Sequence, residues 1–242
     1  MYPHRIRLRG PWDCEPLAGE AGTAPAARTV TMPCTWSEAG LEGFAGKALF
    51  RRRFGAPRQL DAGERVWLTF EGLSQHAEVW LNEELLGQHR GAGPVEFEIT
   101  KRIDDRNELV VEVENGADEG GLWGEVAVEI RCDAFLRDVN FRTVAAQGKT
   151  AILHAEGLVV GQSDRPLEVR LFMDNNQVAE EEVAPSVTGT QFHLEVGGLR
   201  VQRAKPGVEQ TSHFYRVRLD LRHDMAVWYV HEDIVEFFEE PA

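Results

Sequence analysis

The dipeptide Asn82-Glu83 has the residue types that retaining glycoside hydrolases use for general acid/base catalysis. That chemistry needs a second carboxylate about 5–5.5 Å from the first, and no motif in the sequence supplies a partner for Glu83. Asn82 also ends a segment of alternating apolar residues, where asparagine followed by a polar residue is typical of a tight turn. We therefore interpret the dipeptide as a turn and expect no catalytic residue in the chain.

Histidines, serines and glycines offer no stronger reaction centre. The segments His223-Asp224 and His231-Glu232-Asp233 carry metal-ligating residue types, but two histidines eight residues apart without a cysteine rarely form a closed site. No Gly-x-Ser-x-Gly motif marks a nucleophilic serine. Gly91-Ala92-Gly93 lies between strand-like segments and lacks the helix start that holds a phosphate. We expect no metal ligands and no cofactor.

Aromatic residues could instead bind a ligand. Proteins hold sugars by stacking aromatic rings on the CH face of the sugar and offering carboxylates, amides and arginines to its hydroxyls. Three tryptophans lie in loop-like segments, with polar residues flanking the same region. The candidate carbohydrate-binding residues are therefore Trp12, Trp36, His89, Arg90, Asp118 and Trp123. For the tryptophans, filling the hydrophobic core is the alternative role.

The candidate residues are expected to lie on strands or on the loops between them. Alternation of apolar and polar residues, which is the pattern of a strand, dominates the chain. Val66, Leu68 and Phe70 share one face of a segment, and the same period of two recurs through residue 130. Turn residues such as Asp61-Ala62-Gly63 separate the segments. A short helical turn after Thr35 is the only departure expected. The pattern predicts an all-β protein.

The spacing of strands becomes regular after Cys132, which predicts two domains, residues 1–132 and 133–242. Seven short strands in about 100 residues are typical of an immunoglobulin-like sandwich. The expected strands are Leu136–Val144, Ala151–Val160, Leu167–Asp174, Gln177–Ala184, Gln191–Val196, His213–Leu221 and Met225–Val230. The turn at Asp174-Asn175-Asn176-Gln177 predicts a hairpin, and the apolar residues near Phe237 predict either a last strand or a solvated tail.

Composition excludes several classes of partner. The 242 residues carry a net charge of −14, which would be repelled by nucleic acid and by anionic membranes. No apolar run is long enough for a transmembrane helix, and the first residues lack the apolar core of a secretory signal. We expect an intracellular protein, or a chain from which a leader has been removed. Cys14, Cys34 and Cys132 should be reduced and buried, with a Cys14–Cys34 bridge as an alternative in an oxidising compartment.

Several motifs in order resemble one protein family. They are Trp36, Phe50-Arg51-Arg52-Arg53-Phe54, Phe70-Glu71-Gly72, Val79-Trp80-Leu81-Asn82, Gly87-Gln88-His89-Arg90-Gly91 and Phe97-Glu98-Ile99-Thr100. Together they resemble the N-terminal sugar-binding domain of glycoside hydrolase family 2, the β-galactosidases, β-glucuronidases and β-mannosidases. The resemblance implies a galactose-binding-like jelly roll, and the second half of the chain is similar to the immunoglobulin-like domain that follows it in those enzymes.

The resemblance stops short of the family's catalytic centre. Its acid/base and nucleophile residues lie in a (β/α)₈ barrel of about 250 residues, and 242 residues leave no room for one beside two sandwiches. Gly124 also stands where the family often has an arginine after Gly-Gly-hydrophobe-Trp/Tyr. We expect a non-catalytic carbohydrate-binding protein, or a scaffold for a separate catalytic chain. The alternatives are a fragment or subunit of a β-glycosidase and a structural module that binds proteins. A structural calcium ion is a further alternative that the architecture suggests.

Overall fold

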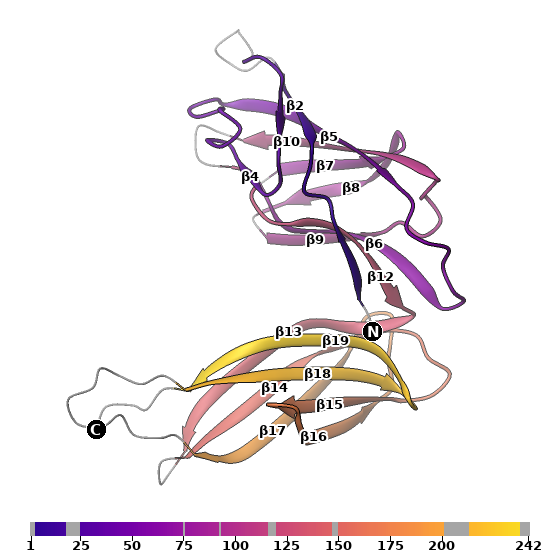
Figure 1. Cartoon of the computed structure of the whole chain (residues 1–242), viewed down its shortest axis with the longest axis vertical. Helices are drawn as coiled ribbons and strands as arrows, with labels where there is room; N and C mark the ends of the chain where they lie inside the picture. The colour runs from indigo at the N-terminus through magenta and orange to yellow at the C-terminus, as the bar shows by residue number, and fades with distance from the viewer. Residues whose placement is uncertain are drawn as a thin grey trace, which may run out of the picture. The chain divides into compact units, whose positions relative to one another are not determined.

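A computed structural model describes residues 3–17, 25–74, 76–91, 93–115, 120–146, 150–200 and 213–237. The chain divides into two compact units, His4–Ile130 and the residues from Arg131 on. All regular elements of the described residues are strands, nineteen in number, so the predicted all-β class is confirmed (Figure 1). Among these residues there is no helix long and apolar enough to span a membrane.

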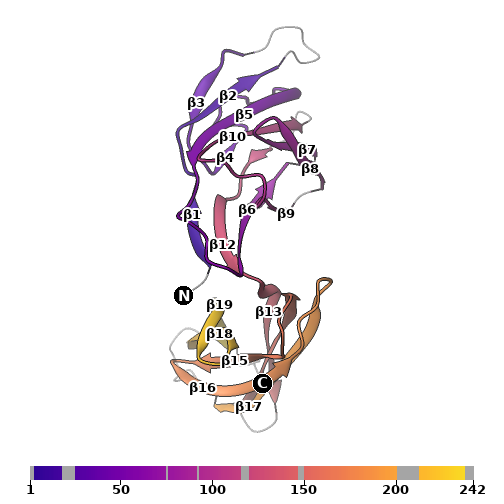
Figure 2. The same ribbon diagram turned by 90° about the vertical axis from the view of Figure 1, so that its right-hand side faces the viewer.

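The N-terminal unit is a sandwich of two antiparallel sheets. A four-stranded sheet has the order β1-β12-β6-β9, and a six-stranded sheet has the order β3-β2-β5-β10-β7-β8. A short pair, β11 with β4, completes the unit. The strands are β1 His4–Arg7, β2 Trp12–Pro16, β3 Arg28–Val30, β4 Cys34–Thr35, β5 Gly46–Gly55, β6 Glu64–Leu73, β7 His76–Leu81, β8 Glu84–Arg90, β9 Gly93–Glu98, β10 Arg106–Asn115, β11 Gly121–Leu122 and β12 Val126–Cys132. Figure 2 shows β1, β12 and β6 side by side.

Alternating apolar residues of both sheets form one core in this unit. Val66, Leu68 and Phe70 of β6 are buried, as the alternation predicts, and so are Leu109 and Val111 of β10. A strand with one apolar face is stable only when that face is covered. The pairing of the two inner faces therefore explains why the segments with period two became a sandwich.

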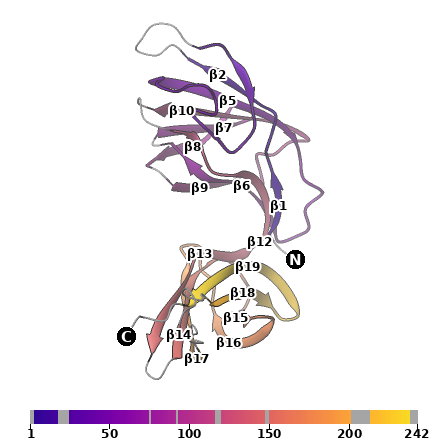
Figure 3. The ribbon, with the colours of Figure 1, turned by 60° about the vertical axis from the view of Figure 1, so that its left-hand side comes forward.

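The C-terminal unit has a three-stranded sheet, β13-β14-β17, and a four-stranded sheet, β16-β15-β18-β19. Its strands are β13 Ala134–Ala146, β14 Thr150–Gly161, β15 Leu167–Met173, β16 Asn176–Val183, β17 Thr190–Arg200, β18 His213–His223 and β19 Ala226–Phe237. Figure 3 shows β14 beside β17. A second set of buried residues, which includes Leu153, Leu171 and Leu219, forms a core of its own.

The predicted hairpin, the predicted strand near Phe237 and the predicted helical turn each have a counterpart in the structure. The β15–β16 hairpin is confirmed, and Asp174 and Asn175 of its turn both have positive φ angles. The apolar residues before Phe237 continue β19 and are not a separate strand. In the N-terminal unit, Thr35 starts a single helical turn, since Ala39 N–H donates to the carbonyl of Thr35 at 2.9 Å. Glu38 and Thr35 cap this turn through reciprocal side-chain to backbone hydrogen bonds.

Candidate functional site

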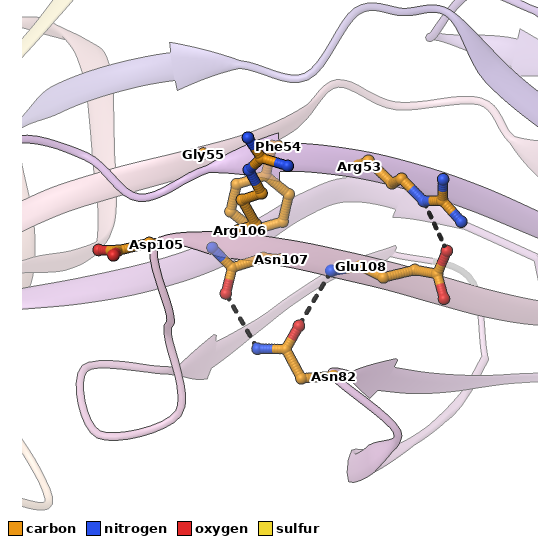
Figure 4. Close-up of a pocket in the computed structure, with 8 residues that line it drawn as sticks. All are labelled: Arg53, Phe54, Gly55, Asn82, Asp105, Arg106, Asn107 and Glu108. Carbon is orange, nitrogen blue, oxygen red and sulfur yellow. Dashed lines mark hydrogen bonds and ion pairs between the residues drawn. The ribbon is translucent and has the colours of Figure 1, made fainter.

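A hollow of about 730 Å³ opens at one end of the six-stranded sheet of the N-terminal unit. It lies where β5 ends, β10 begins and the β7–β8 turn comes back toward them. Its lining residues, drawn in Figure 4, are Arg53, Phe54, Gly55, Asn82, Asp105, Arg106, Asn107 and Glu108. Of the dipeptide Asn82-Glu83 the hollow takes in only Asn82, and of the Phe50–Phe54 motif it takes in Arg53 and Phe54.

The turn at Asn82 is built as the sequence predicts. Asn82 and Glu83 have φ angles of 51° and 69°, and they connect β7 to β8. Two consecutive residues with positive φ form the tight hairpin turn that matches the twist of the strands. Asparagine tolerates this conformation better than most residues, so Asn82 is explained by the backbone and not by catalysis.

Side-chain amides then lock this turn to the start of β10. Asn82 Oδ1 accepts a hydrogen bond from the backbone N–H of Glu108 at 2.9 Å, and its Nδ2 donates to Asn107 Oδ1 at 3.0 Å. Asn107 is only 3% exposed and donates in turn to the carbonyl of Asp104 at 2.6 Å. Both side-chain amides of the hollow are therefore used to hold the protein together.

The remaining lining groups set what the hollow can bind. Arg53 Nε lies 3.0 Å from Glu108 Oε1, so these two charges neutralise each other. Within the described ranges the guanidinium of Arg106 makes no ion pair or hydrogen bond, and the ring of Phe54 is partly buried beneath the opening. An aromatic ring, a guanidinium and a carboxylate are groups suited to binding a polar ligand such as a sugar.

The arrangement does not provide hydrolytic chemistry. Glu108 is held by Arg53, Asp105 is exposed and lies at the other end of the lining from Glu108 (Figure 4), and no histidine is among the described residues that line the hollow. Acid/base catalysis needs a proton donor and acceptor positioned on either side of one bond. The hollow is thus a candidate for binding and not for catalysis.

Two of the three predicted tryptophans belong to the core. Trp12 is 0% exposed and Trp36 is 1% exposed. The indole N–H of Trp12 donates to the carbonyl of Leu8 at 2.6 Å, and that of Trp36 donates to the carbonyl of Phe44 at 2.9 Å. Protein atoms cover both rings, which leaves no face for a sugar. Trp12 and Trp36 therefore fill the core, the alternative role given above, and the prediction that they contact a sugar is corrected.

Trp123 differs, since it keeps 44% of its surface exposed. Its N–H donates to the carbonyl of Leu73 at 3.1 Å, and one face of its ring lies against Gly72, where an added Cβ would meet ring atoms at 2.4 Å. The next residue is fixed by the same packing, because a Cβ on Gly124 would lie 2.0 Å from the backbone nitrogen of Gly72. This contact explains why glycine, and not the family's arginine, follows Trp123.

The polar residues predicted to bind a sugar make no described contact with Trp123. His89 lies in β8, and its Nε2 is buried with no hydrogen-bond partner among the described residues. Arg90 ends the same strand, exposed, opposite His76. Asp118 lies outside the described residues. Over the ranges described, no hydrogen bond, ion pair or ring contact joins Trp123 to His89 or Arg90.

The histidine segments near the C-terminus have structural partners. His223 Nε2 lies 3.0 Å from Asp164 Oδ1 and its ring stacks on Trp228, with ring centroids 4.7 Å apart. Asp224 pairs with Arg165. Burial lowers the pKa of His231, an effect that Asp233 partly offsets. The side chains of His223 and Asp224 thus pair with residues of a neighbouring loop, as polar residues at the ends of strands commonly do.

Most of the N-terminal sandwich is similar to a domain of known proteins. Residues 43–122 match the family model described as glycosyl hydrolase 2 galactose-binding domain-like. A β-glucuronidase of Bacteroides fragilis is 33% identical over 98 residues, covering 37% of this chain and 14% of the relative. A β-galactosidase of Thermoanaerobacter pseudethanolicus is 27% identical over 118 residues, covering 41% of this chain and 16% of the relative.

Solved structures share the fold of both sandwiches. A putative β-galactosidase from Bacteroides fragilis matches 97% of this chain with a TM-score of 0.73 and 18% identity. The β-glucuronidase of Bifidobacterium dentium matches 97% with a TM-score of 0.72 and 19% identity. This chain spans 41% and 48% of those two proteins. The fold of both sandwiches is therefore found within each of these larger proteins.

Proposed function

We propose that this chain, whose N-terminal sandwich is a galactose-binding-like domain of glycoside hydrolase family 2, is the non-catalytic, carbohydrate-binding or scaffold part of a β-glycosidase system. The chemistry would come from a (β/α)₈ catalytic domain, on the same polypeptide or on another. One observation carries the proposal. The chain matches 41–48% of two β-glycosidase structures across both of its own sandwiches, while its described hollows contain no acid/base pair.

The supporting role has a direct test. The chain alone should not hydrolyse chromogenic β-galactosides, β-glucuronides or β-mannosides. Added to a separately produced catalytic barrel of a family 2 enzyme, it should raise hydrolysis above the rate of the barrel alone. Turnover by the chain alone would contradict the non-catalytic assignment, and an unchanged barrel in the presence of excess chain would count against the scaffold.

Trp123 is the candidate contact for carbohydrate. Its ring is fixed by the hydrogen bond to Leu73 and by Gly72 beneath it, so the exposed 44% belongs to the opposite face and the ring edges. A ring already held in place loses little conformational entropy when a sugar stacks on it. Stacking on the apolar face of a pyranose is the interaction that such a surface supports.

Calorimetric titration of the whole chain with galactose, glucuronate, mannose and their oligomers tests this contact. At least one sugar should bind, and Trp123→Ala should weaken it about tenfold, equivalent to about 1.4 kcal/mol. Leu85→Ala is the matched control, because Leu85 is 47% exposed and has no proposed role. Flat thermograms at millimolar sugar, or equal loss in both variants, would refute carbohydrate binding at Trp123 and leave the scaffold role standing.

A further inference from the structure

The tripeptide pattern His-x-Glu occurs on two neighbouring strands of the C-terminal unit. His154-Ala155-Glu156 lies in β14 and His193-Leu194-Glu195 lies in β17. The antiparallel register pairs His154 with Glu195 and Glu156 with His193. Paired residues project from the same face of a sheet, so two imidazoles and two carboxylates form a square on the outer face of the sheet.

The two imidazoles face each other edge to edge. His154 Nδ1 and His193 Nε2 are 3.1 Å apart, and the ring planes differ by only 20°. The ring centroids are 5.3 Å apart. This distance is longer than the 3.1 Å between the two nitrogens by about one ring width, which is the difference expected when each nitrogen lies between its own ring centre and the other ring. Both nitrogens therefore lie on the line between the rings, which share one proton in a hydrogen bond.

We propose that His154 and His193 form a binding site for a divalent transition-metal cation of the Zn²⁺ class. Imidazole nitrogen is a preferred ligand of such ions. Zn–N bonds of about 2.0–2.1 Å that meet at a tetrahedral angle hold two nitrogens about 3.4 Å apart. The observed separation of 3.1 Å needs to widen only slightly as both rings turn toward solvent. The ring that accepts the shared proton already carries its own proton on its far nitrogen. The shared proton therefore moves only to the far nitrogen of the donating ring, Nε2 if that ring is His154 or Nδ1 if it is His193, and both facing nitrogens then offer a lone pair.

Carboxylates surround the pair and favour a cation there. Glu195 Oε2 lies 3.9 Å from His154 Nδ1, and Glu181 accepts a hydrogen bond from the backbone N–H of His193 at 2.9 Å. Glu156 is held at 3.3 Å by Asn140. Among the described residues that pair with His154, Arg142 of β13 is a cation that opposes them, and it is exposed. The surplus of negative charge raises the local concentration of cations.

A hollow of about 380 Å³ gives a hydrated ion access to His193. Gly157, which pairs with Phe192, also lines the hollow, and the buried ring of Phe192 fills the space where a Cβ of Gly157 would lie, 2.9 Å away. A β-bulge between Arg137 and Asn140 shapes its rim, and Asp138 lines the hollow with a φ of 52°. β-Bulges often redirect side chains at binding sites.

The site has two protein ligands, with water completing the coordination. Within the part of the chain that the structure describes, no three histidine, cysteine, aspartate or glutamate side chains already converge on one ion. Glu195 is the side chain placed to become a third ligand by a change of rotamer. The site is therefore of the surface type, reversible and dependent on both imidazoles.

Titration of the whole chain with Zn²⁺ alone, near pH 7.5 and followed by calorimetry, tests the proposal. One ion should bind, and His154→Gln and His193→Gln should each weaken binding at least about tenfold. His223→Gln is the matched control, because His223 lies on the same unit with Asp164 and Trp228 as its partners. Binding that survives both substitutions, or no binding at millimolar Zn²⁺, would overturn the site.

A second measurement does not depend on the folding of a variant. Long-range ¹⁵N spectra of the unmodified chain should show Zn²⁺ shifting Nδ1 of His154 and Nε2 of His193, the nitrogens that face each other. Shifts confined to other histidines would place the ion elsewhere and refute the proposal. The catalytic and carbohydrate tests above are unaffected by either result, because this site lies in the other unit.

Discussion

Asn82 donates a hydrogen bond from its side-chain amide to the side-chain carbonyl of Asn107 at 3.0 Å. This bond ties the β7–β8 turn to the first residues of β10, 25 positions along the chain. Both amides are otherwise occupied by backbone groups of residues 102, 104 and 108. The two amides that border the hollow are consequently held by hydrogen bonds to each other and to the backbone.

Replacing Asn82 should destabilise the chain through lost hydrogen bonds. Asn82→Gly keeps the positive φ but removes the amide, and should lower the free energy of unfolding by about 1–3 kcal/mol. Asn82→Ala should cost about 1 kcal/mol more, because alanine disfavours positive φ. Urea unfolding measures both effects. Asn175→Gly is the control, since Asn175 has a φ of 70° and no side-chain hydrogen bond among the described residues, and a comparable loss there would contradict the role of the amide network.

Gly124→Ala should disturb the packing of Trp123. An added Cβ would lie 2.0 Å from the nitrogen of Gly72 and 2.5 Å from the carbonyl carbon of Glu71. Both are backbone atoms, so the loop must move, at a cost of about 1–3 kcal/mol. Denaturant unfolding gives the cost, and a red shift of tryptophan fluorescence would report the movement of the ring. Gly197→Ala is the control and should be nearly neutral, because no atom lies within 4 Å of its added Cβ. An equal loss of stability in the two variants would show that the contact with Gly72 does not cause the effect of Gly124→Ala.

Stability of the C-terminal unit should fall on acidification through His231. Burial of its ring, which also packs against Phe141, lowers its pKa in the folded chain below the usual value of 6.5. The unfolded chain therefore binds the proton first, and stability is lost as pH falls through 6.5 toward the folded pKa. His231→Phe keeps an aromatic ring without a titrating group. Its urea midpoint should change less between pH 7.5 and 5.5 than that of the unchanged chain, and equal slopes would refute the assignment.

The thiols of Cys14 and Cys34 should resist modification in the folded chain. Burial is the main cause that raises the pKa of each to about 11, so both remain protonated at pH 8, and the thiolate is the reactive form. Mass spectrometry after iodoacetamide treatment should find both unmodified until urea is added. Met225→Cys, at a position 87% exposed, gives a thiol that reacts at once. Rapid native modification of Cys14 would contradict the buried environment.

Sequence patterns predicted the strands well, because period two and turn residues are local signals. The β15–β16 hairpin and the turn at Asn82 were both expected from their residue types. The burial of Trp12 and Trp36 could not be read from loop-like surroundings, since it depends on which distant strands cover them. The two His-x-Glu tripeptides were visible but uninformative alone, because only the register of β14 with β17 brings His154 to His193.

The buried residues form two clusters, one from Leu8 to Val128 and the other from Ala134 to Val235, and no described side chain belongs to both. Each cluster can therefore melt as its own cooperative transition. A substitution that weakens one sandwich should leave the other folded. Damage that would unfold a single-core protein of this length can then remain confined to half of the chain.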